Sequence, residues 1–326
     1  MKLGKKGGIA IFTLLGVIAA AVVILHQNLG PAADPKEELI KKILSCMIIA
    51  GACIGFAVFY DKVTGLAGEL FQSRHLIWKL AKNDFKKRYA GSYLGAIWAM
   101  VQPVVTVALY YVVFEVIMNG ASRTEEAPFV LFLTAGLVPW FFFSEALNTG
   151  TNALREYDYL VKKVVFKISI LPIIKIIAAT FIHAFFVVVL LVIAAIYKVY
   201  PTIYVLQIFY YSACLFLLVL AICYTTCSIV VFFKDLSQII SILLQIGMWA
   251  TPILWDMTLL PEKWQKFIKL NPLVYIINGY RCAVYKHEWF FQDFFSTVYF
   301  WMFTIVTFGI GTIIFKRLKV HFADVL

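Results

Sequence analysis

Charged residues are scarce in this chain of 326 residues. Asp, Glu, Lys and Arg together make up 14% of it, whereas an average soluble domain contains about 25%. Hydrophobic residues make up 62%, and the mean hydropathy is +0.87. This composition excludes an ordinary soluble core and indicates an integral membrane protein.

The motifs of common enzymes are also missing. There is no G-x-x-x-x-G-K-[ST] segment to hold nucleotide phosphates, so we expect that this chain does not hydrolyse ATP. The six cysteines show no C-x-x-C spacing and the five histidines do not cluster, so we expect neither a metal site nor a cofactor. His183 lies in the middle of an apolar run, where we expect a hydrogen-bonded packing residue, although an ionisable group there is also a functional candidate.

The chain instead has long apolar runs. Eight of them are long enough to be membrane spans, at residues 9–25, 43–60, 97–118, 129–147, 173–196, 203–231, 239–255 and 294–315. The first could also be a cleaved signal peptide, but it is longer than the usual apolar region and no A-x-A site follows, which favours a retained anchor. We therefore predict an all-α, polytopic membrane protein.

The net charge of +11 reflects cations at the ends of these runs. Basic segments at 2–6, 74–88, 155–167, Lys234 and 316–319 all fall on one side of an eight-span topology, which the positive-inside rule makes cytoplasmic together with both termini. The cations between Lys263 and Lys286 count against this assignment, because this topology places them outside the cell. Acidic neighbours offset part of their charge, so the assignment is kept. Such a distribution is typical of topology signals and contacts with membrane lipids, so we expect no nucleic-acid binding.

Residues 74–90 form a basic amphipathic segment. At helical spacing, Ile77, Ala81 and Phe85 fall on one face, and the lysines fall on the other. We predict a helix in the membrane surface that binds anionic lipid headgroups, with an ordinary solvated face as the alternative. The residues expected to hold headgroups are Lys79, Lys82, Lys86, Lys87 and Arg88.

Five segments carry a resemblance to a known family. They are NDFKKRYAGSYLGAIWAMVQP, LVKKVVFKISILP, FFKDLSQI, NPLVYIINGYRCAVY and FKRLKVHFADVL. In this order and spacing, residues 74–326 resemble the membrane subunits of type-2 ABC exporters of polysaccharides, which export O-antigen, capsule or teichoic acid. The resemblance implies a six-span permease domain at 74–326, preceded by an added two-span hairpin at 1–61 and a linker at 62–73.

The resemblance also implies partners. The chain would act as a homodimer in a bacterial inner membrane, bound to two copies of a separate ABC ATPase subunit that holds ATP and magnesium, and a lipid-linked glycan would pass between the two permease copies. A type-2 ABC permease for a drug or small lipid is the first alternative. A membrane-embedded lipid-sugar transferase is a further one, which the lack of clustered Asp, Glu or His disfavours.

Three further sites are expected from the residues together with this resemblance. Aromatic rings could line a sugar channel or else form an interfacial belt: Tyr110, Tyr111, Trp140, Phe141, Phe142, Phe143, Trp249 and Trp255. Two basic and apolar segments are expected to couple to the ATPase, or else carry only topology charge: Arg155, Tyr157, Leu160, Lys162 and Lys163, with Lys234 and Asp235. Residues 257–286 are expected to form re-entrant helices that close the outer end, broken at Asn271-Pro272, or else a surface loop with interfacial helices: Trp264, Asn271, Pro272, Tyr275 and Arg281.

Overall fold

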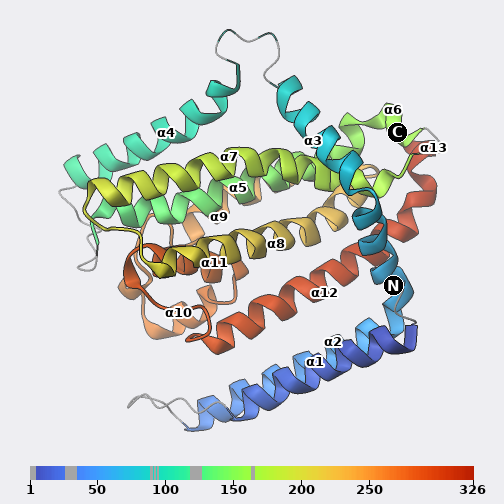
Figure 1. The fold of residues 1–326 in the computed structure, drawn as a ribbon, viewed down its shortest axis with the longest axis horizontal. Helices are drawn as coiled ribbons and strands as arrows, with labels where there is room; N and C mark the ends of the chain where they lie inside the picture. The colour runs from blue at the N-terminus through green and yellow to red at the C-terminus, as the bar shows by residue number, and fades with distance from the viewer. Residues whose placement is uncertain are drawn as a thin grey trace.

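The computed structural model describes residues 5–25, 35–88, 91, 93, 95–117, 127–162 and 166–326. The regular elements of this part of the chain are helices (Figure 1), which confirms the predicted all-α fold. Five of these helical stretches are long and apolar enough to cross a membrane: Gly7–Leu25, Phe129–Glu156, Ile168–Ile196, Ile203–Val230 and Phe294–Val325. Shorter apolar helices at Ser45–Val58, Trp98–Tyr111 and Leu236–Ala250 coincide with the remaining predicted spans, whose total of eight stays a prediction.

Helix α5 (Phe129–Glu156) lies at the centre of the bundle. It packs against α7 (Leu171–Ile196) and α8 (Gln207–Val230), and residues around its whole circumference are buried. Small residues let the helices approach closely: a Cβ added at Gly150 would lie 2.6 Å from the Cys223 sulfur on α8. Helix α12 (Phe294–Leu318) packs on α8, while α4 (Trp98–Tyr111) and α9 (Leu236–Ala250) contact α5.

Two predicted span ends need correction. Helix α5 continues to Glu156, beyond the predicted end at residue 147, and Gly150, Ala153 and Leu154 of this extension are buried. Helix α9 ends at Ala250 instead of residue 255. Thr251 has an extended backbone there, as expected for a residue before proline, and Pro252 follows it.

The N-terminal hairpin consists of α1 (Lys5–Leu25) and α2 (Pro35–Gln72), which lie side by side along α12 (Figure 1). Helix α2 runs without a break through residues 62–72, which lie within the predicted linker at 62–73. Leu66 is buried against the core and the Ser169 hydroxyl donates to Glu69 Oε2 at 2.7 Å. Leu66 and Leu70, spaced by four, give this segment an apolar helical face that packs.

The two ends of the bundle differ. Helix α3 (Arg74–Arg88) crosses one end of the spans, near α6 (Asp158–Val161) and α13 (Phe322–Val325), while α10 (Glu262–Ile268) and α11 (Pro272–Arg281) lie at the other end (Figure 1). A helix is thus present over the described residues 74–88, as predicted, while its place in the membrane surface stays a prediction. The predicted break is confirmed as well, because Asn271 caps α11 by accepting a hydrogen bond from the Leu273 backbone N–H at 3.0 Å.

Candidate functional site

Four side chains at the α3 end of the bundle form a cluster that we call the Asp84 ion cluster: Asp84, Glu156, Tyr157 and Lys175. The Lys175 ammonium lies 2.7 Å from Asp84 Oδ1 and 2.5 Å from Glu156 Oε2. The Tyr157 hydroxyl donates to the same Asp84 oxygen, and the ammonium sits over the Tyr157 ring at 4.9 Å. The cluster therefore joins α3, the end of α5 and the first turns of α7.

Burial makes this cluster energetically important. The side chains of Lys175 and Asp84 are only 6% and 8% exposed, whereas Glu156 is 49% exposed. Burial raises the pKa of the Tyr157 hydroxyl, and its hydrogen bond to Asp84 raises this pKa further, so Tyr157 stays a proton donor. A buried charge is tolerated only when it is paired, so the three charged groups hold each other in place. Helix α3 is consequently fixed to the bundle, although most of its other side chains, four lysines among them, are exposed.

A second ion pair fixes the far end of α3. Arg88, its last residue, pairs with Glu145 on α5. Arg88 is also one of the residues predicted to hold lipid headgroups, and its guanidinium is engaged by this carboxylate. The other four predicted residues, Lys79, Lys82, Lys86 and Lys87, are exposed, and the Lys82 ammonium lies 5.1 Å from the centre of the Trp78 ring.

The two predicted coupling segments lie next to each other. Arg155 near the end of α5 reaches the Ser237 hydroxyl in the first turn of α9, at 3.5 Å, and this hydroxyl donates to Asn152 Oδ1 at 2.7 Å. These contacts place the exposed turn with Lys234 and Asp235 beside the segment from Arg155 to Lys162. The side chains of the segment from Arg155 to Lys162 lie in different environments. Arg155 and Lys162 are exposed, Leu160 packs on the core, Tyr157 belongs to the ion cluster, and Lys163 lies outside the described residues.

Comparison with known proteins identifies the family. The family model described as "ABC-2 type transporter" matches residues 75–285. The chain belongs to this family. An O-antigen export system permease protein RfbA from Myxococcus xanthus is 29% identical over 225 residues, which cover 68% of this chain and 85% of the relative. A protein of the same name from Klebsiella pneumoniae is 26% identical over 254 residues, 77% of this chain and 95% of the relative. The polysialic acid transport protein KpsM from Escherichia coli is 23% identical over 234 residues, 72% of this chain and 89% of the relative.

The predicted channel aromatics of this ABC-2 transporter separate into two groups. Trp140, Phe142 and Phe143 are buried inside the chain, where Trp140 packs against Gly247 of α9 and Phe142 packs against His183. Because α5 is buried on most sides, these three rings fill the core of this chain, and their place in a channel wall stays a prediction. The remaining five are open or partly open. Tyr110, Tyr111, Phe141 and Trp255 are half-buried, and Trp249 on α9 is exposed.

Arg281 holds together the end of the transporter opposite α3. Its guanidinium stacks on the Phe132 ring of α5 at 3.6 Å, and Nη2 donates to the Ile253 carbonyl at 3.1 Å. Asn271 Nδ2 donates to the Thr251 hydroxyl at 3.1 Å, which adds a second link to the segment after α9. Of the other predicted residues here, Tyr275 lies 3.1 Å from the Tyr210 hydroxyl and 3.0 Å from that of Thr297, Pro272 opens α11, and Trp264 is exposed on α10.

His183 is a packing residue, as predicted. Its Nε2 lies 2.9 Å from the Tyr280 hydroxyl and 3.1 Å from the Ser212 hydroxyl, which connects α7 to α11 and α8. Among the described residues, no group of three or more His, Cys, Asp or Glu side chains could hold a metal ion.

Sequence reasoning missed the Asp84 ion cluster. A usable signal was present: Asp84 follows Ile77 and Ala81 at helical spacing, and all three are buried, so an acidic residue occupies the apolar face of α3. Lys175 likewise stands alone inside an apolar run. Because a buried charge needs an opposite charge beside it, an acidic and a basic residue that both lie on buried faces are expected to pair.

Proposed function

We propose that this ABC-2 transporter is the channel-forming membrane subunit of an exporter that moves a lipid-linked polysaccharide across a bacterial inner membrane. The observation that carries the proposal is the similarity, over most of the chain, to proteins named for O-antigen export and polysialic acid transport. ATP is hydrolysed by a separate ABC ATPase subunit, present in two copies, which holds ATP and magnesium.

A second copy of the chain completes the channel in this proposal. Helices α4 and α9 leave rows of apolar side chains exposed, among them Val105 and Leu109 on α4 and Leu243 and Ile246 on α9. The two helices approach each other, since the Tyr110 hydroxyl lies 3.8 Å from the Met248 sulfur. Two copies that bury these faces against each other would place Trp249 and the half-buried tyrosines near the shared path.

Motion of the ATPase would reach α3 through the Asp84 ion cluster. We propose that the α3 end of the bundle faces the cytoplasm, where the ATPase docks on the segment from Arg155 to Lys162 and on the turn with Lys234 and Asp235. Glu156 and Tyr157 lie within the first of these segments and contact Lys175 and Asp84 directly. A displacement of the docked segment would therefore shift α3 and the chain that leads into α4.

The lysines of α3 give a testable consequence. Replacing Lys82, Lys86 and Lys87 by glutamate should lower export by about five-fold per residue, because each cation near an anionic surface contributes about 1 kcal/mol. The measurement is the amount of polysaccharide at the cell surface at equal protein level. Lys263→Glu on the exposed face of α10, at the other end of the bundle, is the control. Unchanged export in the variant with all three lysines replaced would contradict a headgroup role for them.

Depletion of the chain in its own host tests the function itself. Surface polysaccharide should fall, lipid-linked polysaccharide should accumulate inside the cell, and both should return when the intact chain is supplied. Normal surface polysaccharide after complete depletion would overturn the proposed function.

A further inference from the structure

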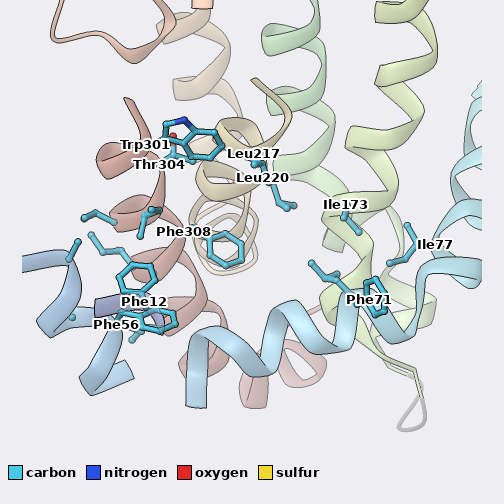
Figure 2. A pocket seen from close by; sticks show the side chains of 18 of the residues that line it. Phe12, Phe56, Phe71, Ile77, Ile173, Leu217, Leu220, Trp301, Thr304 and Phe308 are labelled. Carbon is cyan, nitrogen blue, oxygen red and sulfur yellow. The ribbon is translucent and has the colours of Figure 1, made fainter. Parts of the chain in front are cut away.

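A large apolar cavity separates the N-terminal hairpin from the rest of the bundle. Its volume is about 840 Å³, toward the upper end of the range of about 300–1,000 Å³ for small-molecule sites. Representative lining residues are Phe12 and Phe56 of the hairpin, Phe71 and Ile77 near α3, Leu220 of α8 and Phe308 of α12. Figure 2 shows the Phe12 and Phe56 rings on one side of the cavity and Phe71 beside Ile77 at another end.

Small residues keep this cavity open. Gly55 on α2 and Gly309 on α12 both line it, and a Cβ added at either position would meet no heavy atom within 4 Å. The Phe12 and Phe56 rings stack with their centres 4.0 Å apart, which holds α1 and α2 together beside the open volume. At the level of these two rings the hairpin is therefore separated from the bundle, whereas near Leu66 helix α2 packs against the bundle.

The dimensions of the cavity match one leaflet of a bilayer. Its lining on α12 runs from Trp301 to Ile313, over which a helix rises about 18 Å. The hydrocarbon core of a bilayer is about 30 Å thick, so one leaflet contributes about 15 Å. The cavity is thus long enough to hold acyl chains that run from the α3 end of the bundle toward the middle of the membrane.

Among the described residues that line the cavity, Arg74 is the one with a charge. It begins α3, its guanidinium lies 4.9 Å from the centre of the Phe71 ring, and Nη1 donates to the Phe71 carbonyl at 3.4 Å. Within the part of the chain that the structure describes, Arg74 forms no ion pair. The polar groups of Thr304 and Trp301 in the lining are already hydrogen-bonded, to the Phe300 carbonyl and the Tyr210 hydroxyl. A ligand that fits must be apolar for the depth of a leaflet and anionic at the Arg74 end.

We propose that the cavity holds a phospholipid with an anionic headgroup, whose phosphate lies at Arg74 and whose acyl chains lie between the hairpin and α12. This site lies away from α4 and α9 and takes a resident lipid rather than the transported molecule. Its occupant joins the hairpin to the bundle where the protein itself leaves them apart. The lipid would occupy this site whichever molecule the transporter exports.

Photolabelling of the intact transporter tests the site. The full chain, purified with any co-purifying subunit, is placed in phosphatidylcholine nanodiscs that contain a trace of phosphatidylglycerol with a diazirine on its acyl chain. Adducts are mapped by mass spectrometry and should lie on the cavity-lining peptides of α2 and α12. The double variant Gly55→Leu with Gly309→Leu should lose these adducts, because leucine fills the open space. Gly68→Leu on α2, which also meets no heavy atom within 4 Å but does not line the cavity, should keep them.

The headgroup is tested separately with Arg74→Gln. The preference for labelled phosphatidylglycerol over an equally labelled phosphatidylcholine should fall by about five-fold, the effect of removing one cation from an anionic surface. Arg317→Gln, an exposed cation at the end of α12 that does not line the cavity, should leave the preference intact. Equal labelling by both lipids, or adducts that persist in the leucine double variant, would overturn the proposal. Displacement by unlabelled lipid-linked polysaccharide but not by unlabelled phosphatidylglycerol would identify the occupant as transported substrate and overturn it too.

Discussion

Replacing Lys175 with methionine is expected to destabilise the folded transporter by about 3–5 kcal/mol, the cost of removing one partner from a buried ion pair. Methionine preserves the length of the side chain, so the loss of packing is small. Asp84 would then stay buried near Glu156 with only the Tyr157 hydroxyl as a donor. The measurement is the temperature at which half of the detergent-purified protein is lost from the monodisperse peak. Lys167→Met, an exposed lysine close in sequence, should change this temperature little.

A double variant separates folding from coupling at the same place. Lys175→Met combined with Asp84→Asn removes both buried charges, so most of the lost stability should return. If the ion cluster also links the ATPase to α3, ATP hydrolysis in this stable double variant should no longer respond to the transported molecule. A single variant as stable as the unmodified protein would contradict the cost assigned to the buried pair. A stable double variant with a normal response would show that the cluster only stabilises the fold.

Arg281→Lys is expected to disrupt the opposite end of the bundle. Lysine keeps the charge but loses the planar group that stacks on Phe132 at 3.6 Å and the fork that reaches the Ile253 carbonyl. The stacking of a desolvated cation contributes about 2 kcal/mol, and a hydrogen bond from a charged group contributes about 1.5–3 kcal/mol. Lysine can still approach the Ile253 carbonyl, so the lost stacking sets the minimum effect. We therefore expect the free energy of unfolding to fall by at least about 2 kcal/mol.

Proteolysis reports whether that loss is local. With Arg281→Lys, cleavage should increase in the segment from residue 256 to residue 271, because α11 is less firmly held to α5. Lys269→Arg, an exposed substitution in the same segment, should leave the cleavage rate unchanged. Equal cleavage of the Arg281→Lys variant and the unmodified protein would show that the guanidinium is not needed to hold α11 to α5.

Local pattern was sufficient for much of the fold. Apolar runs predicted the helices, the alternation of apolar residues and lysines predicted α3, and Asn271-Pro272 predicted the start of α11. Each of these depends on the chain within a few residues, through helical spacing, capping or the restricted backbone before proline. The continuous helix through residues 62–72 could not be predicted in this way, because the packing of Leu66 depends on a core built from distant parts of the chain.

Side-chain partners far apart in sequence could not be predicted in the same way. Asp84 and Lys175 are separated by 91 positions and meet only because α3 crosses the beginning of α7. The same limit explains the channel residues. Trp140 and Trp249 have similar surroundings in the sequence, yet one is 5% exposed and the other 59%, because α5 lies inside the bundle and α9 at its edge.

ATP hydrolysis by the purified transporter tests the central claim most directly. The chain is purified from its host with whatever subunits accompany it, and ATPase activity is measured in nanodiscs with and without lipid-linked polysaccharide. We predict a co-purifying subunit with a P-loop whose ATPase activity changes when the lipid-linked polysaccharide is added and does not change with the polysaccharide lacking its lipid. A chain that purifies without any ATP-hydrolysing partner, or a complex whose ATPase activity ignores the lipid-linked polysaccharide, would contradict the account.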